Sequence, residues 1–270
     1  MYGASRASFD AVVEHVDPVL SAAGSDATLI AEHLFDVVDV LDSSGRLRRA
    51  LTDPARSGEH KDDLVSDLFT GRDQRVLDIV AALASARWSE ATDLSDGIED
   101  MAVEALLAGA ESAGELDALE EELFLIERTM VAERDVLIAL DNRSATDDAR
   151  RNLATAIFGG KVSDTAYRLL ERAAVSPRGR RVSVALAEFV QAAAARRQRA
   201  VAHVTAAVDL TAEQRTRLAG ILTKAYGRKI RLNVAVDPSV VGGIRVQVGH
   251  EVVDGTILSR LDDARRRLVG

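Results

Sequence analysis

Apolar residues recur at three- and four-residue steps through most of the first 200 positions, which is the spacing of one helix face. Phe9, Val12 and Val16 begin the first of these stripes. The stripe predicts a helix from Ala4 to Asp17, ended by Pro18 because a residue before proline disfavours helical backbone. An amphipathic helix of this kind needs a partner helix to cover its apolar side.

The helical pattern occurs twice along the chain. Aromatic and glycine positions repeat 89 residues apart in the pairs Phe35 and Phe124, Phe69 and Phe158, and Gly71 and Gly160. After a polar break, each copy also has a hydroxyl residue, Ser57 or Thr146, where a helix needs an N-cap. We therefore predict a duplicated helical unit, with copies at Ser25 to Gly109 and Ala113 to Arg199. The alternative is two unrelated Ala- and Leu-rich stretches in accidental register.

The pattern changes at Ala200, where β-branched residues in partial alternation predict a strand to Val208. Thr211 and Gln214 then form a capping box that opens a helix. The remaining expected elements are strands at Lys229 to Val236, Ile244 to Gly249 and Glu251 to Val253, and a helix at Thr256 to Leu268. The expected fold is mainly α with a small α+β C-terminal domain, and its N-terminal helical bundle contains the duplicated helical unit. The predicted domains are residues 1–110, 111–199 and 200–270.

Composition supports a helical protein in a reducing compartment. Hydrophobic residues make up 47% of the chain but aromatic residues only 4%, so the core must be built from Ala, Leu, Val and Ile. The absence of cysteine excludes disulfides, thiolate metal sites and a cysteine nucleophile. No stretch approaches the roughly 18 apolar residues that span a bilayer, so we expect no direct membrane insertion.

The charge distribution argues against nucleic acid as the main ligand, because the net charge is −9 and the phosphate backbone requires a basic face. One segment is locally basic, with seven arginines and two acids between Glu171 and Ala200. The segment from Ala110 to Asp135 is strongly acidic. These segments predict complementary solvated faces, with a polyanion site as the alternative.

The sequence contains no recognisable catalytic, cofactor-binding or metal-binding motif. It has no phosphate-binding loop, no nucleophile elbow and no Rossmann fingerprint, and its five histidines lie far apart. Gly242 and Gly243 precede a predicted strand rather than a helix N-terminus, which argues against phosphate binding there. We therefore expect no catalytic residues, no cofactor and no metal. Trp88, the only tryptophan, is interpreted as a core or interface anchor.

The C-terminal segment carries the most specific pattern in the chain: an Asp, a Gly-Gly pair, an alternating strand, a Gly, a short strand, Asp-Gly and a helix with Arg-Leu. These positions are Asp237, Gly242, Gly243, Gly249, Asp254, Gly255, Arg260 and Leu261. The pattern resembles the signature of the ATP synthase delta subunit family, whose mitochondrial member is the oligomycin-sensitivity-conferring protein. The glycines suit positions with positive φ or close approach, so a structural role is expected for the motif.

The resemblance implies a non-catalytic adaptor in the stator of an F-type ATP synthase, at the cytoplasmic face of the cell membrane. Its implied partners are N-terminal helices of the alpha subunits and b-type subunits of the peripheral stalk, in support of proton-driven ATP synthesis. The candidate partner-binding residues are Phe9, Val12 and Val16 in the first helix, and Ile257, Leu261 and Leu268 in the last.

The usual family member has one helical unit, so the sequence suggests that the second copy, Ala113 to Arg199, is an expansion resembling actinobacterial-type delta subunits. Two other functions stay open at this point. One is a generic helical interaction scaffold unrelated to ATP synthase. The other is an enzyme whose site is assembled from dispersed residues.

Overall fold

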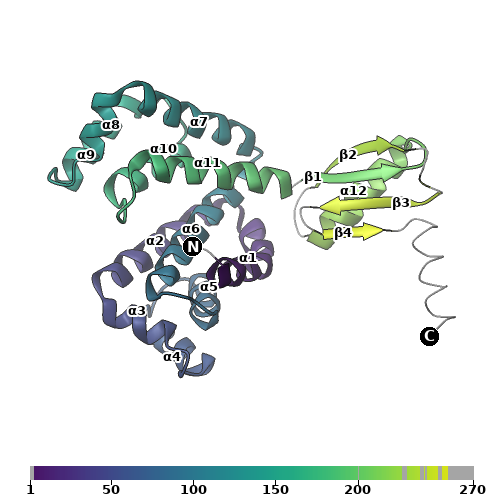
Figure 1. Cartoon of the computed structure of the whole chain (residues 1–270). Helices are drawn as coiled ribbons and strands as arrows, with labels where there is room; N and C mark the ends of the chain where they lie inside the picture. Colours follow the sequence, from purple (N-terminus) through teal and green to yellow (C-terminus); the bar gives the residue numbers. More distant parts are fainter. Residues whose placement is uncertain are drawn as a thin grey trace. The chain divides into compact units, whose positions relative to one another are not determined.

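A computed structural model describes residues 3–199, 201–226, 230–237, 240, 242–248 and 251–254 (Figure 1). The chain divides into two compact units, Met1–Ala193 and Ala194–Gly270. The first unit is entirely helical, and the second contains a small sheet with one described helix of its own. This agrees with the expected fold class of a mainly α protein with a C-terminal α+β domain.

The first half of the helical unit is a six-helix bundle. Its helices are α1 (Gly3–Ala23), α2 (Ala27–Ser43), α3 (Gly45–Thr52), α4 (Gly58–Leu68), α5 (Gln74–Ser85) and α6 (Ala91–Ala113). In this bundle α1, α2, α3 and α5 pack against α6, and α4 packs against α5. Side chains begin three of these helices by accepting hydrogen bonds from otherwise unpaired first-turn amides: Ser44 for α3, Ser57 for α4 and Asp73 for α5. The expected cap at Ser57 is therefore confirmed.

The expected end of the first helix was wrong. α1 continues through Pro18 to Ala23, and a short 3-10 turn, Gly24–Asp26, follows it. A proline inside a helix removes one backbone hydrogen bond. Here the packing of Val16 and Leu20, both buried, holds the helix together on either side of Pro18. Tertiary contacts thus outweigh the local preference.

The second half of the unit repeats the order and spacing of the first. Its helices are α7 (Leu116–Ala132), α8 (Arg134–Leu140), α9 (Asp147–Phe158), α10 (Asp164–Val175) and α11 (Val182–Arg199). α7, α8 and α9 each begin 89 residues after α2, α3 and α4, as 116 − 27, 134 − 45 and 147 − 58 show. Thr146 caps α9 as Ser57 caps α4. Gly71 and Gly160 adopt positive φ, 86° and 70°, just beyond these helices.

A buried cation also recurs at equivalent positions in the two halves. Lys61 on α4 donates from Nζ to the carbonyl oxygen of Ala84, 2.8 Å away, near the end of α5. Arg150, 89 residues later on α9, donates to the carbonyl oxygen of Val175 at the end of α10. Each cation satisfies a carbonyl that the helix end leaves unpaired. Desolvation by burial lowers the pKa of Lys61. These correspondences support the duplication, which stays a prediction until the two halves are superposed.

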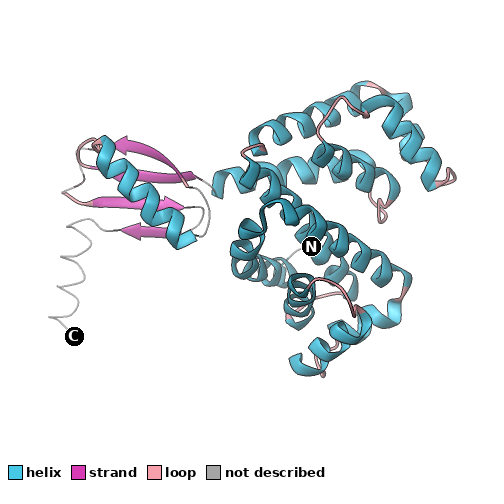
Figure 2. Cartoon of the chain, turned by 180° about the vertical axis from the view of Figure 1, so that it is seen from behind, coloured by secondary structure: helices cyan, strands magenta, loops and turns pink. Residues whose placement is uncertain are grey.

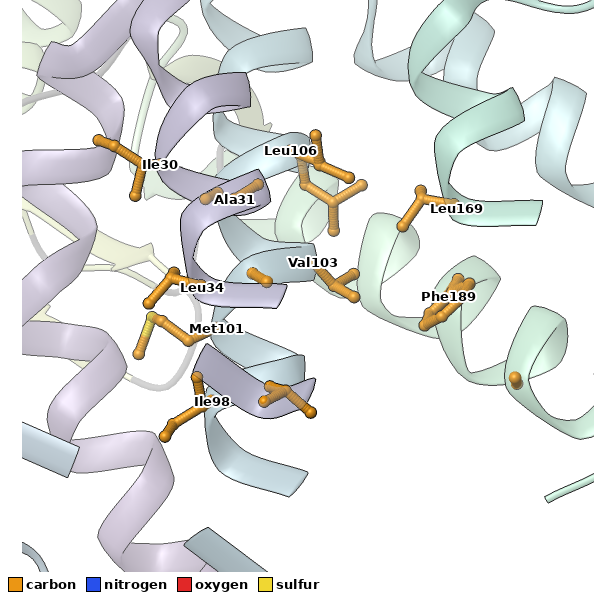
Figure 3. Close-up of a cluster of buried hydrophobic side chains, with 14 of the residues drawn as sticks. Ile30, Ala31, Leu34, Ile98, Met101, Val103, Leu106, Leu169 and Phe189 are labelled. Carbon is orange, nitrogen blue, oxygen red and sulfur yellow. The ribbon is translucent and has the colours of Figure 1, made fainter. Parts of the chain in front are cut away.

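α6 lies between the two halves and is buried nearly all round. Residues that face opposite directions on it, including Ile98, Met101, Val103 and Leu106, are at most 2% exposed. Figure 3 shows Ile98 and Met101 near Leu34 of α2, and Val103 and Leu106 on the side of Leu169 and Phe189. A helix with apolar residues on opposite sides must be covered on both of those sides. α6 is therefore the common core helix of both halves.

Trp88 belongs to this core rather than to an exposed interface. Its indole Nε1 donates to the carbonyl oxygen of Leu83 at 2.7 Å. The ring lies against Gly97 of α6, where an added Cβ would be 2.6 Å from a ring carbon. Glycine is required there because any side chain would displace the indole.

The second unit is a four-stranded mixed sheet with a helix on one face (Figure 2). Its elements are β1 (Val201–Ala206), α12 (Ala212–Tyr226), β2 (Arg231–Val236), β3 (Ile244–Val248) and β4 (Glu251–Asp254). The order is β2-β1-β3-β4, with β1 parallel to β2 and antiparallel to β3. Ala202 and Val204 of β1 pack with Leu222 of α12. Thr211 and Gln214 exchange the two hydrogen bonds of the expected capping box.

Candidate partner-binding surfaces

The described part of the C-terminal motif is a structural turn. Gly242 and Gly243 both have positive φ, 73° and 81°. The amide of Asp237 donates to the carbonyl oxygen of Ala206 at 2.9 Å, and Asp237 then accepts from the amide of Val240 at 3.1 Å. The chain must cross the end of β1 here, because β2 and β3 lie on opposite sides of that strand. Tight turning therefore accounts for the Gly-Gly pair.

Asp254 is the last residue of β4. The other motif and stripe residues lie outside the described residues: Gly249, Gly255, Ile257, Arg260, Leu261 and Leu268. The expected last helix, Thr256 to Leu268, lies outside them too. Their proposed roles stay predictions.

The candidate residues of the first helix lie mainly inside the bundle. Phe9 and Val16 are 3% and 4% exposed and belong to the chain's own core, while Val12 is half-buried against it. Phe9 and Val16 therefore offer little surface to a partner in this conformation. A partner helix on α1 would have to use Val12 and neighbouring exposed positions.

Three arginines of the arginine-rich segment, Arg172, Arg178 and Arg180, do not form a solvated face, as the sequence suggested, but belong to a buried ionic junction between the two halves, whereas Arg181 and Arg197 are exposed. Glu99 of α6 is 1% exposed, and arginines from α10 and the loop after it surround its carboxylate. Arg172 Nε lies 3.3 Å from one Glu99 oxygen, and Arg178 lies 3.3 Å from the other. Arg180 also pairs with Glu99.

The same arginines reach acids of the first half, rather than the acidic segment 110–135. Arg172 lies 2.8 Å from Asp39, and Arg178 lies 2.6 Å from Asp42. Arg178 has a positive φ of 48°, which is uncommon for a residue with a side chain. Burial would lower the pKa of Arg178, but the bond to Asp42 and the charge of Glu99 more than offset this effect. The sequence pattern could not predict this junction, because its partners lie up to 136 residues apart along the chain.

Asp100, next to Glu99, has an unusual protonation. Burial raises its pKa to about 7, and the negative charges of Glu99 and Asp96 add to the effect. An aspartate in the unfolded chain loses its proton near pH 4, whereas folded Asp100 keeps it to about pH 7. The folded state therefore binds the extra proton between these values, and this group makes stability fall as pH rises.

The substitution Asp100→Asn is expected to remove the loss of stability that Asp100 causes as pH rises. The stability of the variant relative to the natural chain should grow as pH rises from about 4 to 7, by up to about 1.4 kcal/mol per pH unit, and then level off. Urea unfolding at a series of pH values measures the difference. A difference that does not change with pH would show that Asp100 ionises normally in the fold.

A cleft of about 490 Å³ lies beside the junction, between α2 and α10. Arg72, Arg151, Arg168 and Arg172 line it, but acids from the same walls pair with each of them. An anion would have to compete with these carboxylates, so the cleft has no surplus positive charge. Within the described residues, no group of three or more His, Asp or Glu side chains could hold a metal ion.

The most exposed apolar side chains of the helical unit lie on α7 and α8. Phe124, Leu125, Val131 and Ile138 are 55%, 53%, 65% and 58% exposed. The sequence pattern identified Phe124 only as a repeat position, and it did not single out the other three residues because Leu, Val and Ile are common in helices. Only the fold shows that they face away from the core. No helix among the described residues is long and apolar enough to cross a membrane.

Comparison with known proteins decides the family. The family model described as "ATP synthase delta (OSCP) subunit" matches residues 98–268. The chain is 48% identical to ATP synthase subunit delta of Beutenbergia cavernae over 271 residues, covering 100% of both chains. It is 49% identical to that of Kineococcus radiotolerans over 269 residues, covering 99% of this chain and 98% of the relative.

The chain belongs to the ATP synthase delta (OSCP) subunit family. The relatives named above are actinobacterial and match this chain over 98% or more of their own length, as the resemblance to long delta subunits suggested. A chain in the cryo-EM structure of the Toxoplasma gondii mitochondrial ATP synthase hexamer is also similar, at 17% identity. That similarity covers 63% of this chain and 97% of the other, with a TM-score of 0.32, too low to support a structural conclusion.

The extent of the family match corrects one expectation. The delta family model begins at Ile98, inside α6, and continues through the second helical copy into the C-terminal unit. The part of the chain outside the family pattern is thus residues 1–97, not the second copy at Ala113 to Arg199. Because Phe9, Val12 and Val16 lie in that part, their position does not correspond to the first helix of the family pattern.

Proposed function

We propose that the chain is the non-catalytic stator subunit of an F-type ATP synthase, joining the catalytic head to the peripheral stalk and supporting proton-driven ATP synthesis. The observation that carries the proposal is the full-length similarity to delta subunits at 48% and 49% identity. The generic scaffold is not favoured, because an unrelated scaffold would not share nearly half its residues with this family along its whole length.

In this proposal the helical unit binds N-terminal helices of alpha subunits, and the C-terminal unit binds the b-type stalk subunit. Helical bundles suit the first task because grooves between helices accept an amphipathic helix. The proposed domains are residues 1–110, 111–199 and 200–270, with the first two related by duplication. The protein then acts at the cytoplasmic face of the cell membrane, held there by its partners.

The test uses the purified chain, catalytic heads stripped of this subunit, and isolated b-type stalk. The chain is expected to bind both and to restore proton-driven ATP synthesis in vesicles that contain the remaining subunits. Alone it is expected to hydrolyse no ATP, because the sequence lacks a phosphate-binding loop. Failure to bind either partner would contradict the proposed function, and ATP turnover lost on changing a carboxylate of this chain would indicate an enzyme.

A further inference from the structure

In the first half of the helical unit, the outer face of α2 is acidic and is covered by arginines of α10. Arg168 pairs with Glu32, and Arg172 lies 2.8 Å from Asp39. The guanidinium of Arg172 also lies over the ring of Phe35, with its carbon 4.7 Å from the ring centre. The α2 face therefore depends on positive charges that another helix supplies.

The equivalent face of α7 is exposed along its whole length. Glu121 and Phe124 lie 89 residues after Glu32 and Phe35, at the same places in α7 as those residues have in α2. Figure 1 shows α7 on the side of α10 and α11 that faces away from the first half. The exposed positions of α7 follow the spacing of one helix face: Asp117, Ala118, Glu121, Phe124, Leu125, Arg128, Val131 and Ala132.

The charges on this face differ from those of the α2 face. Arg128 stands at the place of Asp39, so the charge there is reversed. Two other aspartates of α2 are replaced by apolar residues, Leu125 and Val131. Neither Glu121 nor Arg128 forms an ion pair with any residue that the structure describes. The α7 face thus carries an acid and an arginine of its own, one on either side of an apolar centre.

The order of these residues is self-complementary for two antiparallel copies of α7. A twofold axis that crosses the face between Phe124 and Leu125 places Glu121 of each copy level with Arg128 of the other, because the two residues are equally far from the axis along the helix. The same axis brings the Phe124 and Leu125 side chains of the two copies together at the centre. Each ion pair between copies then repeats the acid–arginine pairing that covers α2 in the first half.

We propose that the exposed face of α7, defined by Glu121, Phe124, Leu125 and Arg128, binds the same face of a second copy of this chain through antiparallel α7 helices. The contact uses one patch on both copies, so it closes at a dimer and cannot extend into a filament. Pairing removes from water apolar side chains that the free chain exposes. The inference goes beyond the proposed function, and it is tested without any other subunit.

The size of the face predicts a weak, reversible dimer. α7 has 17 residues and is therefore about 25 Å long. A contact one helix wide over this length lies at the low end of interface sizes, so we expect a Kd in the micromolar range. Phe124 and Leu125 are 55% and 53% exposed, and their burial favours association. The flanking ion pairs fix the antiparallel register and make the Kd sensitive to salt.

The experiment measures the dimer Kd of the full-length chain by sedimentation equilibrium. The variants Glu121→Arg and Arg128→Glu each place like charges opposite each other twice, so we expect each to raise Kd about tenfold or more. The double variant restores both ion pairs in the opposite sense, and its Kd should return to within about threefold of the natural value.

The matched control is Arg46→Glu, because Arg46 is exposed on α3 and forms no ion pair with any residue that the structure describes. Its Kd should change less than about twofold. Circular dichroism of every variant confirms that the helices are intact, as expected for exposed positions.

A covalent trap tests the position of the twofold axis. The chain has no cysteine, so a single introduced cysteine can form a disulfide only with a second copy. Leu125→Cys lies next to the proposed axis and should be oxidised to a covalent dimer, because the two sulfurs can approach closely there. Leu29→Cys is the control, since Leu29 is 47% exposed on α2, outside the proposed face, and should stay largely monomeric.

Two outcomes would overturn the inference. One is a natural chain that sediments as a monomer at every concentration up to the millimolar range. The other is a dimer whose Kd neither charge reversal changes, or which the double variant weakens further, because such a dimer forms through another surface. Both outcomes leave the proposed function intact, since that function is tested by binding to heads and stalk.

Discussion

Glu99→Gln is expected to lower the free energy of unfolding of the helical unit by about 3 kcal/mol. Glu99 is 1% exposed and is the shared counter-charge of Arg172, Arg178 and Arg180. Removing one partner of a buried ion pair leaves a buried charge uncompensated, which costs more than the pair itself contributes. Glutamine keeps the size of the side chain, so the change isolates the effect of charge.

Urea unfolding, monitored by the fluorescence of Trp88, measures this effect. Trp88 is the only tryptophan, and its ring lies against Gly97 of α6, two residues before Glu99. Asp10→Asn is the matched control. It removes a pair with Arg6 in which both side chains are more than half exposed, and it should change stability by less than about 0.5 kcal/mol. Equal unfolding midpoints for the Glu99 variant and the natural chain would mean that Asp39, Asp42 and Asp96 alone compensate the arginines.

Deletion of residues 256–270 is expected to abolish proton-driven ATP synthesis while leaving ATP hydrolysis by detached heads unchanged. The deleted segment contains the predicted stripe Ile257, Leu261 and Leu268. Each large apolar residue contributes about 1.5 to 3 kcal/mol when fully buried. The binding free energy of a complex with a Kd between micromolar and nanomolar is about −8 to −12 kcal/mol. Loss of three such contacts should release the stalk.

The measurement compares ATP synthesis in membrane vesicles that contain either the natural or the shortened chain. Circular dichroism of the purified shortened chain confirms that the helical unit still folds. A matched variant replaces Arg265, Arg266 and Arg267 by alanine, which keeps the apolar stripe and tests whether charge contributes to stalk binding. A folded, shortened chain that supports synthesis at the normal rate would show that the stalk is attached elsewhere.

Local sequence determined the elements of this protein and their repetition. Ser57, Thr146 and the Thr211–Gln214 box are helix caps whose hydrogen bonds involve neighbours within three residues, so the sequence alone could identify them. The repeated Phe and Gly positions indicated equivalent helices because they recur at a fixed spacing of 89 residues along the chain. The pattern from Asp237 to Leu261 was specific enough to indicate the family, because each of its turns constrains the residues present.

Tertiary structure alone decided what depends on long-range contacts. Pro18 lies within a helix because buried residues on both sides of it hold the helix together. Arg172 and Arg178 lie in a buried junction because the fold brings α10 and its following loop to α6. Phe35 and Phe124 occupy equivalent places in a repeated sequence, yet α10 covers one and the other is exposed. Sequence spacing determines which face of a helix is apolar, but only the packing of distant segments determines which face is already occupied.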